Sequence, residues 1–408
     1  MRSNWRSGTV EEIAEFENHL RIPLSAEQRA ERPGEYPYWG ANGPFDTVGD
    51  FLFDGARVLV AEDGNTVVRP DGRGTVHWAT GRYWVNNHAH VLNVKSGHDL
   101  RWLFYALSAA RVRDFVSGSA QPKLSMGSFK RLPLHVPPPA EQRRISSVLG
   151  ALDDKIDTNR RLARLLEEIA KTEFEARFVD FLGFVGLADS QLGPLPEEWH
   201  VGTLADLADV HKQQVKPAEA PHTLFEHFSI PAFDAGNGPS IEPGRVILSA
   251  KTTVPGPECV LVSKLNPNTK RVWWPQPDGA EAAVCSPEFL VLVPLTDIPT
   301  SYLYAVISSD DRFYRELLSH VAGTTGSRQR VTPTAAMNCR VILPTVEALE
   351  VWDALARPLY DYAHSLIAEC RPLREVRDML LPKLISGEVR VPAAADPDDV
   401  ASPLMPAN

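Results

Sequence analysis

Apolar residues recur at steps of three and four along residues 137–181 and predict one long helix. The apolar positions are Ile145, Leu149, Leu152, Ile156, Leu162, Leu166 and Ile169. At ~1.5 Å per residue, a helix of about forty residues spans roughly 60 Å, which is more than one compact domain needs. We therefore expect this helix to bridge two domains, with its apolar stripe forming a coiled-coil seam.

The start of this helix and its one polar seam position are both marked in the sequence. Pro138 or Pro139 supplies the fixed backbone angle of a first helical turn, and Glu141 places negative charge against the helix dipole. Asn159 interrupts the stripe. It either fixes the register of a helix pair or is merely solvated, and the sequence leaves both readings open.

A second helical pattern follows Pro344 and supplies a partner for the first helix. Its apolar positions are Val351, Leu355, Tyr362, Leu366, Leu373, Val376 and Leu380. Pro358 and Pro372 fall inside this pattern, so we expect the second helix to be kinked or broken there.

The segment before the first long helix has the pattern of a mixed α/β domain, and the segment after it repeats the plan. Strands are predicted at 57–61, 75–78, 88–92 and 132–136, with a helix at 100–115 and a short amphipathic element at 8–16. In the second half, the matching segments are 202–210, 259–263, 301–318, 326–331 and 339–343. This self-similarity predicts two similar domains, each ending in a strand and a long helix.

Composition adds limits to this picture. The chain of 408 residues is 43% hydrophobic, enough for two or three domains, yet no run of eighteen apolar residues occurs. The first eight residues lack the apolar stretch of a signal peptide, so a cytoplasmic location is expected. The four cysteines, Cys259, Cys285, Cys339 and Cys370, are scattered without metal-ligand spacing and are interpreted as ordinary thiols.

Charge is unevenly distributed along the chain. The net charge is −10, but residues 1–138 contain 16 Lys and Arg against 15 Asp and Glu, whereas residues 345–408 contain 6 against 11. The first half is therefore nearly neutral and free to carry a local basic face. The acidity weakens a DNA-binding interpretation without excluding it.

Several stretches resemble the specificity subunit of type I restriction-modification systems. The segment 138–159, which begins Pro-Pro-Ala-Glu-Gln-Arg-Arg-Ile, and the segment 178–181 are similar to that family's central conserved region. The segment 380–388, Leu-Leu-Pro-Lys-Leu-Ile-Ser-Gly-Glu, is similar to its C-terminal conserved region.

The resemblance implies an α+β fold with two similar mixed α/β target recognition domains separated by a pair of long antiparallel coiled-coil helices. The implied boundaries are 1–137 and 191–344 for the two recognition domains, 138–190 and 345–391 for the two long helices, and 392–408 for a disordered tail. Each recognition domain would bind one half of a split DNA target.

The resemblance also implies partners. Adenine methyltransferase subunits would dock on the chain and supply S-adenosylmethionine chemistry, and a restriction or translocase subunit would join them. The chain itself would bind no cofactor and catalyse nothing.

The motifs of the competing enzyme classes are incomplete. Asn266-Pro267-Asn268 lacks the second proline and the aromatic residue of an adenine methyltransferase motif and is more simply a turn. Pro277-Asp278 with Glu281 lacks the lysine of a nuclease core, because Ala283 stands in its place. No Gly-x-x-x-x-Gly-Lys loop occurs. His88 and His90 alternate on a predicted strand, where lone histidines are usually structural.

Base readout requires Arg, Lys, Asn or Gln on exposed loops, with further cations on phosphates. Both halves offer such residues at matching positions, and the Gly-Ser-Arg-Gln-Arg stretch at 326–330 is the strongest because it has no core to serve. The candidate DNA-binding residues are Tyr38, Trp39, Asn42, Ser96, Gln121, Lys123, Lys251, Lys264, Asn266, Arg328, Gln329 and Arg330. The aromatic pair Tyr38 and Trp39 has an alternative role in packing inward.

Two other functional classes stay open from the sequence. One is a coiled-coil scaffold without a DNA role, and the other is a methyltransferase or nuclease whose motifs are unrecognised. S-adenosylmethionine binding or DNA cleavage by the isolated chain would indicate the second class.

Overall fold

The computed structural model describes residues 5–118, 121–236, 238–277, 279, 282–321 and 329–392. Arg328 and residues 393–408 of the predicted tail lie outside this range. The chain divides into two compact units: the first is Met1–Lys155 with Leu373–Asn408, and the second is Ile156–Pro372. The division falls inside both long helices, α5 (Pro139–Phe178) and α10 (Val346–Ser386).

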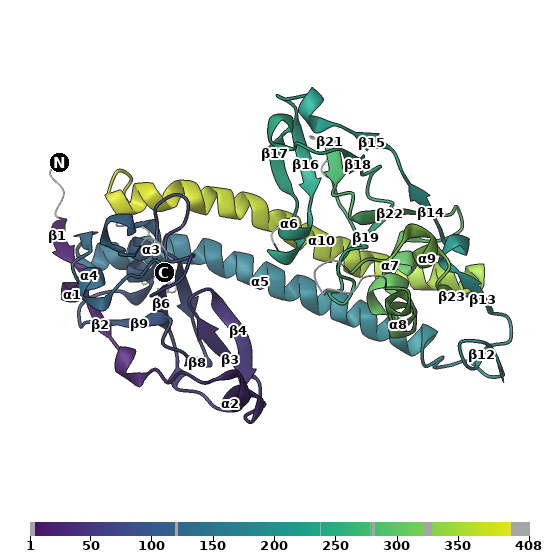
Figure 1. Cartoon of the computed structure of the whole chain (residues 1–408), viewed down its shortest axis with the longest axis horizontal. Helices are drawn as coiled ribbons and strands as arrows, with labels where there is room; N and C mark the ends of the chain where they lie inside the picture. The colour runs from purple at the N-terminus through teal and green to yellow at the C-terminus, as the bar shows by residue number, and fades with distance from the viewer. Residues whose placement is uncertain are drawn as a thin grey trace, which may run out of the picture. The chain divides into compact units, whose positions relative to one another are not determined.

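The first unit combines short strands with short helices and the adjoining parts of α5 and α10 (Figure 1). Its strands are β1 (Arg6–Thr9), β2 (Ala14–Phe16), β3 (Tyr36–Gly40), β4 (Gly43–Val48), β5 (Phe53–Asp54), β6 (Arg57–Ala61), β7 (Val76–Ala79), β8 (Arg82–Val85), β9 (Ala89–Val94) and β10 (Pro133–Val136). Its short helices are α1 (Val10–Ile13), α2 (Ala26–Ala30), α3 (Leu100–Ala109) and α4 (Met126–Lys130), with 3-10 turns η1 (Asn18–Leu20) and η2 (Arg113–Phe115).

Two four-stranded sheets form the body of this unit. One has the order β2-β9-β6-β7 and is antiparallel throughout; the other has the order β4-β3-β8-β5, with β3 and β8 parallel. Side chains of β6 alternate between two cores: Val58 and Val60 pack with the helices, whereas Leu59 packs with the second sheet. Because both faces of β6 are covered, its sequence is continuously apolar rather than alternating.

The second unit repeats this plan with additional strands. Its strands are β11 (Leu187–Ala188), β12 (Leu195–Pro196), β13 (His200–Thr203), β14 (Ala208–His211), β15 (Gln214–Val215), β16 (Leu224–Phe228), β17 (Ser240–Pro243), β18 (Lys251–Thr253), β19 (Val260–Ser263), β20 (Val272–Trp273), β21 (Ala282–Cys285), β22 (Phe289–Pro294) and β23 (Arg340–Leu343). Its short helices are α6 (Ile230–Asp234), α7 (Thr300–Ser309), α8 (Asp311–Ser319) and α9 (Pro333–Met337), with 3-10 turns η3 (Leu204–Asp206), η4 (Pro217–Glu219) and η5 (Gly244–Val246).

The sheet topology confirms the repeat. The order β14-β22-β19-β20 matches β2-β9-β6-β7, and β13 pairs with β23 as β1 pairs with β10. The second sheet of this unit, β15-β18-β21-β16-β17, again contains one parallel pair, β16 with β21. The two units therefore share an α+β architecture, in which each unit has helices, a four-stranded antiparallel sheet and a second sheet with one parallel pair.

Four local predictions need correction. Residues 8–16 are not one amphipathic element, because a turn of helix capped by Thr9 and Glu12 separates two strands. The helix predicted at 301–318 is two helices, since Asp310 caps the start of α8. The helix predicted at 100–115 ends at Ala109 and is followed by a separate 3-10 turn. The second sheet of each unit was not predicted, although part of it lies in the aromatic segment Tyr36–Gly40.

The long helices also differ in part from expectation. α5 forms as predicted, and the buried Gln142 fixes its start: its Oε1 accepts from the Asp99 N–H at 2.9 Å and its Nε2 donates to the Pro137 carbonyl at 2.9 Å. α10, however, continues through Pro358 and Pro372 as one 41-residue helix, so of the expected kink or break, the break does not occur. Both prolines are exposed, and a missing backbone hydrogen bond there leaves groups that water can reach.

In the second unit, the two long helices run antiparallel. Asn159 is 1% exposed and donates from Nδ2 to the Leu366 carbonyl at 3.3 Å and to Glu369 at 2.7 Å. Ala163, one turn later on α5, packs with Ala363, which comes before Leu366 on α10. The two helices therefore run in opposite directions. Asn159 is thus a buried link between the helices rather than a solvated residue. Within the described residues, no helix has the length and apolarity needed to cross a membrane.

Candidate nucleic-acid interface

A junction of two loops in the second unit brings together several predicted DNA-binding residues. The segment after β19 meets the segment before α9, where Asn266 N–H donates to the Gln329 carbonyl at 2.8 Å and Val331 N–H donates to the Lys264 carbonyl at 3.1 Å. Asn268 Nδ2 also donates to Gln329 Oε1 at 2.8 Å. Asn266 adopts φ +47°, a left-handed conformation that asparagine tolerates in turns. These bonds hold Lys264, Asn266, Gln329 and Arg330 in one place, which we call the second-unit junction.

Arg330 is the exposed cation of this junction. Its side chain is 60% exposed, and Nη2 lies 2.6 Å from Glu288 Oε1. Because an exposed ion pair of this kind contributes little to stability, Arg330 can exchange Glu288 for a phosphate or a base edge at small cost.

The first unit contains an equivalent junction between the segment after β6 and the segment before α4. Gly64 N–H donates to the Pro122 carbonyl at 3.1 Å, and Leu124 N–H donates to the Glu62 carbonyl at 2.8 Å. Gly64 adopts φ +97°, the counterpart of Asn266. Lys123, the counterpart of Arg330, is 53% exposed, with Nζ 3.4 Å from Glu62. We call this site the first-unit junction.

A buried polar network supports the first-unit junction. His90 is fully buried; its Nε2 donates to the Leu124 carbonyl at 2.8 Å, and its Nδ1 accepts from Asn18 Nδ2 at 2.9 Å. Burial lowers the pKa of His90, so its ring is neutral and has the Nε2–H tautomer that both bonds require. Burial would raise the pKa of Glu62, but a hydrogen bond from Arg21 at 2.8 Å and nearby positive charges lower it. An ionised Glu62 therefore lies directly beneath Lys123.

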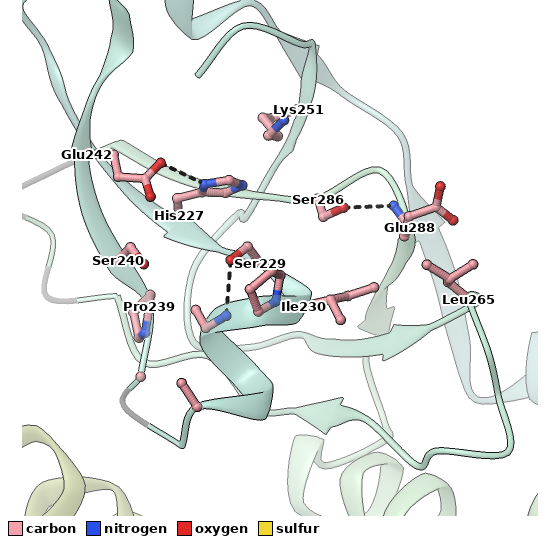
Figure 2. Close-up of a pocket in the computed structure, with 14 residues that line it drawn as sticks. His227, Ser229, Ile230, Pro239, Ser240, Glu242, Lys251, Leu265, Ser286 and Glu288 are labelled. Atoms are coloured by element: carbon pink, nitrogen blue, oxygen red, sulfur yellow. Dashed lines mark hydrogen bonds and ion pairs between the residues drawn. The ribbon is translucent and has the colours of Figure 1, made fainter. Parts of the chain in front are cut away.

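A cavity of about 920 Å³ adjoins the second-unit junction, because Leu265 and Glu288 form part of its lining (Figure 2). His227 Nδ1 lies 3.1 Å from Glu242 Oε2 on one wall. Lys251 also lines the cavity and donates from Nζ to the Ser249 hydroxyl. Burial lowers the pKa of Lys251, and the charge of Glu242 opposes that shift. The cavity thus presents donors and acceptors in a concave surface beside the exposed Arg330.

The remaining candidate residues are more scattered. Asn42 and Gln121 are exposed, and Asn42 accepts a hydrogen bond from Thr66. Trp39 is half-buried against His77 and Tyr83. Ser96 is exposed but follows the end of β9 opposite to the first-unit junction, so the structure does not group it with Lys123.

Two candidates are not the exposed loop residues that the sequence suggested. Tyr38 is 1% exposed, and its hydroxyl oxygen accepts from the Leu24 N–H at 2.8 Å, so its place is in the core. Lys251 is 7% exposed and belongs to strand β18. The aliphatic stem of Lys251 is covered by the cavity wall, and only a ligand that enters the cavity would meet its ammonium group.

Other chemistry has a structural explanation. His88 is not on β9 but precedes it, and its Nδ1 lies 2.7 Å from Asp63, whereas His90 is buried, so the two do not face one ligand. All four cysteines are buried, and none of them forms a disulfide. No group of side chains suited to a metal ion occurs among the residues that the structure describes.

Sequence reasoning missed the residues that position the junctions. Asn18, Arg21 and Glu62 lie far apart along the chain from Lys123, and no local pattern links them. The sequence also did not indicate that Asn268 and Glu288 belong to the second-unit junction. The usable signal was positional: in each half, a polar segment directly follows the central apolar strand.

Comparisons with known proteins agree with this repeated architecture. Residues 2–168 match the family model for the type I restriction modification DNA specificity domain. A putative type I restriction enzyme specificity subunit of Haemophilus influenzae is 33% identical over 143 residues, which are 35% of this chain and 36% of that protein. The MjaIX type I restriction enzyme specificity subunit of Methanocaldococcus jannaschii is 25% identical over 317 residues, 73% of this chain and 71% of that protein.

The fold has a counterpart among solved structures. The S subunit of a type I restriction-modification system from M. genitalium superposes with a TM-score of 0.58 at 14% identity, covering 94% of this chain and 96% of that one. Residues 2–168 thus match the type I restriction modification DNA specificity domain, and the chain shares the fold of the S subunit from M. genitalium.

Proposed function

We propose that this chain recognises a bipartite DNA sequence, with each unit binding one half of the target. The observation that carries the proposal is that both units contain the same kind of junction. In each unit, the segment after the central strand, β6 or β19, is hydrogen-bonded to a segment that presents an exposed cation, Lys123 or Arg330. Such cations suit phosphates and guanine edges. Neighbouring amides at Asn266 and Gln329 suit adenine.

The two half-sites differ in this proposal because equivalent positions carry different charges. Glu62 and His88 in the first unit correspond to Lys264 and Glu288 in the second, since each pair is joined by the same backbone hydrogen bond. Glu62 places negative charge beneath Lys123 in the first-unit junction, whereas Lys264 adds positive charge to the second-unit junction. Surfaces with these opposite charges favour two unlike half-sites.

The proposal assigns catalysis to partner subunits. Adenine methyltransferase subunits that bind S-adenosylmethionine dock on the long helices, and a restriction or translocase subunit completes the complex. Solvent-facing apolar residues on α5 support docking there: Leu165 is 44% exposed and Ile169 is 51% exposed. This chain binds no cofactor in the proposal and acts through recognition and assembly.

The experiment measures DNA affinity of the assembled complex as a function of salt. Replacing Arg330 with Ala should weaken binding and reduce the slope of log K against log salt by about 1, the contribution of roughly one phosphate contact. Arg340→Ala is the matched control, because Arg340 is also exposed and paired with a glutamate, Glu316, at 3.1 Å. Equal effects of the two substitutions would contradict the assignment of the second-unit junction.

A broader test separates the functional classes. Methylation by the complex should require this chain and follow one bipartite sequence, and exchanging the second unit for that of a relative should change only one half of that sequence. Failure to bind duplex DNA with partner subunits present would favour a scaffold. S-adenosylmethionine binding by the isolated chain would favour an enzyme.

A further inference from the structure

The second unit contains a second cavity, which shares Gly238 and Pro239 with the larger one but has a different lining. It has a volume of about 310 Å³, at the small end of the range for organic-ligand pockets. Its walls come from both sheets, α6, α7 and the two long helices. They include Phe228, Phe233, Trp273, Trp274 and Tyr304. The cavity is therefore mostly aromatic.

The polar lining of this cavity includes the carboxyl groups of Glu167 and Glu226, the imidazole of His364, the amide of Gln276 and the guanidinium of Arg371. Glu167 of α5 lines the cavity, and no hydrogen-bond or ion-pair partner for its carboxyl group exists among the described residues. The ring of His364, on α10, makes a T-shaped contact with Trp274 at a centroid distance of 5.2 Å. The buried Nδ1 of His364 has no hydrogen-bond partner in the described chain. Glu226 adds a second carboxyl group, 3% exposed, from β16.

We propose that this cavity binds a small organic cation, a guanidinium or primary amine carrying a short apolar body. Aromatic faces attract cations through their quadrupole, and a carboxylate accepts charge-assisted hydrogen bonds from N–H donors. A neutral His364 with its proton on Nε2 offers a further acceptor at Nδ1. The apolar body contacts the aromatic walls, while the donors reach Glu167 and His364.

The electrostatics of the cavity support this assignment. Burial raises the pKa of Glu167, and burial lowers the pKa of His364 to about 4. Both shifts disfavour the charged forms, so a bound cation supplies the counter-charge that lets Glu167 ionise. The other titratable or charged groups around the cavity are Glu226, Tyr304, Tyr360 and Arg371.

The test uses butylguanidine and its neutral isostere butylurea with the full-length protein, monitored by tryptophan fluorescence because Trp273 and Trp274 line the cavity. Butylguanidine should bind with a dissociation constant on the order of 1 mM, and butylurea should bind at least about tenfold more weakly. Binding of butylguanidine should weaken as pH falls, since protonation of Glu167 removes its charge. Equal binding of the two compounds, or no saturable change with butylguanidine, would overturn the proposal.

Variants on α5 provide the matched comparison. Glu167→Gln preserves side-chain size and should lower butylguanidine affinity about tenfold or more. Glu168→Gln changes the adjacent exposed residue and should leave affinity unchanged. Because DNA contact is assigned to the junctions, the Glu167→Gln protein should keep the DNA affinity of the parent chain. A failure of the cavity proposal and a failure of the proposed function are therefore measured separately. If both variants bind butylguanidine like the parent chain, the cavity is not its site.

Discussion

At the scale of single residues, buried polar side chains hold the solvent-facing loops in place. His90 is the clearest example, since it connects Asn18 to the segment that carries Lys123 through two hydrogen bonds. A neutral histidine can perform this role only while its lowered pKa keeps it unprotonated. The first-unit junction should therefore depend on both this residue and pH.

Replacing His90 with Ala should lower the free energy of unfolding by about 2–4 kcal/mol, because it leaves a cavity and an unpaired buried carbonyl. The unfolded chain binds a proton at this histidine near its ordinary pKa of 6.5, whereas the folded chain does so only at lower pH. His90 thus lowers stability as pH falls below about 6.5, and the difference between parent and variant should shrink there. Urea unfolding at several pH values measures this, with exposed His88→Ala as control.

Tyr38→Phe should lower the free energy of unfolding by about 1–3 kcal/mol without changing DNA affinity of the folded protein. The substitution removes the oxygen that accepts from the Leu24 N–H and leaves that buried donor unpaired. Tyr362→Phe, at a 52% exposed tyrosine of α10, should have little effect in the same unfolding experiment. A loss of DNA affinity with unchanged stability would return Tyr38 to the interface.

At the scale of elements, the long helices show how packing overrides the low helix propensity of proline. α10 stays helical across two prolines because Trp352, Ala356 and Tyr360 are buried in the same core as Phe174 and Phe178 of α5. Each proline costs about 3 kcal/mol in a helix interior, but burial of an aromatic side chain returns a similar amount. Stability of this helix therefore comes from its buried face.

Pro358→Ala should raise the free energy of unfolding by up to about 3 kcal/mol. Alanine restores a backbone N–H and removes the ring from an exposed position where no packing is lost. Denaturant unfolding of the full chain measures the change, and Pro372→Ala provides a second exposed site. A decrease in stability at both sites would mean that the prolines shape the helix in a way that packing requires.

At the scale of the whole molecule, α5 and α10 each pass through the division between the two units. In the proposed function, their length sets the spacing between the half-sites. This assignment follows from chain continuity and the proposed bipartite target.

Inserting four helical residues near Asn159, with a matching turn in α10, should lengthen the preferred DNA spacer. The insertion adds about 6 Å, which corresponds to roughly two base pairs at about 3.4 Å each. Methylation of a target library with varied spacers measures the preference. An unchanged spacer in a folded, active complex would show that the helices do not set the distance.

The sequence determined those features that depend on local periodicity or on repetition. The two long helices, the central strands such as Arg57–Ala61 and the duplicated order of elements were readable, because burial on one or both faces leaves a regular pattern of apolar residues. Ile169, Val351 and Tyr362 of the predicted apolar stripes are nevertheless exposed. The position of the second-unit junction was also readable, since a polar segment follows each central strand. Motif similarity then indicated the family.

Only the tertiary structure decided which polar residues work together. Tyr38 and Lys251 look like surface residues in the sequence but are buried, because sheets that pair distant segments cover them. The network of Asn18, Glu62 and His90 and the aromatic cavity beside Glu167 likewise join residues that are remote in the chain. Long-range pairing leaves no local periodicity, so only folding brings such groups within hydrogen-bonding distance.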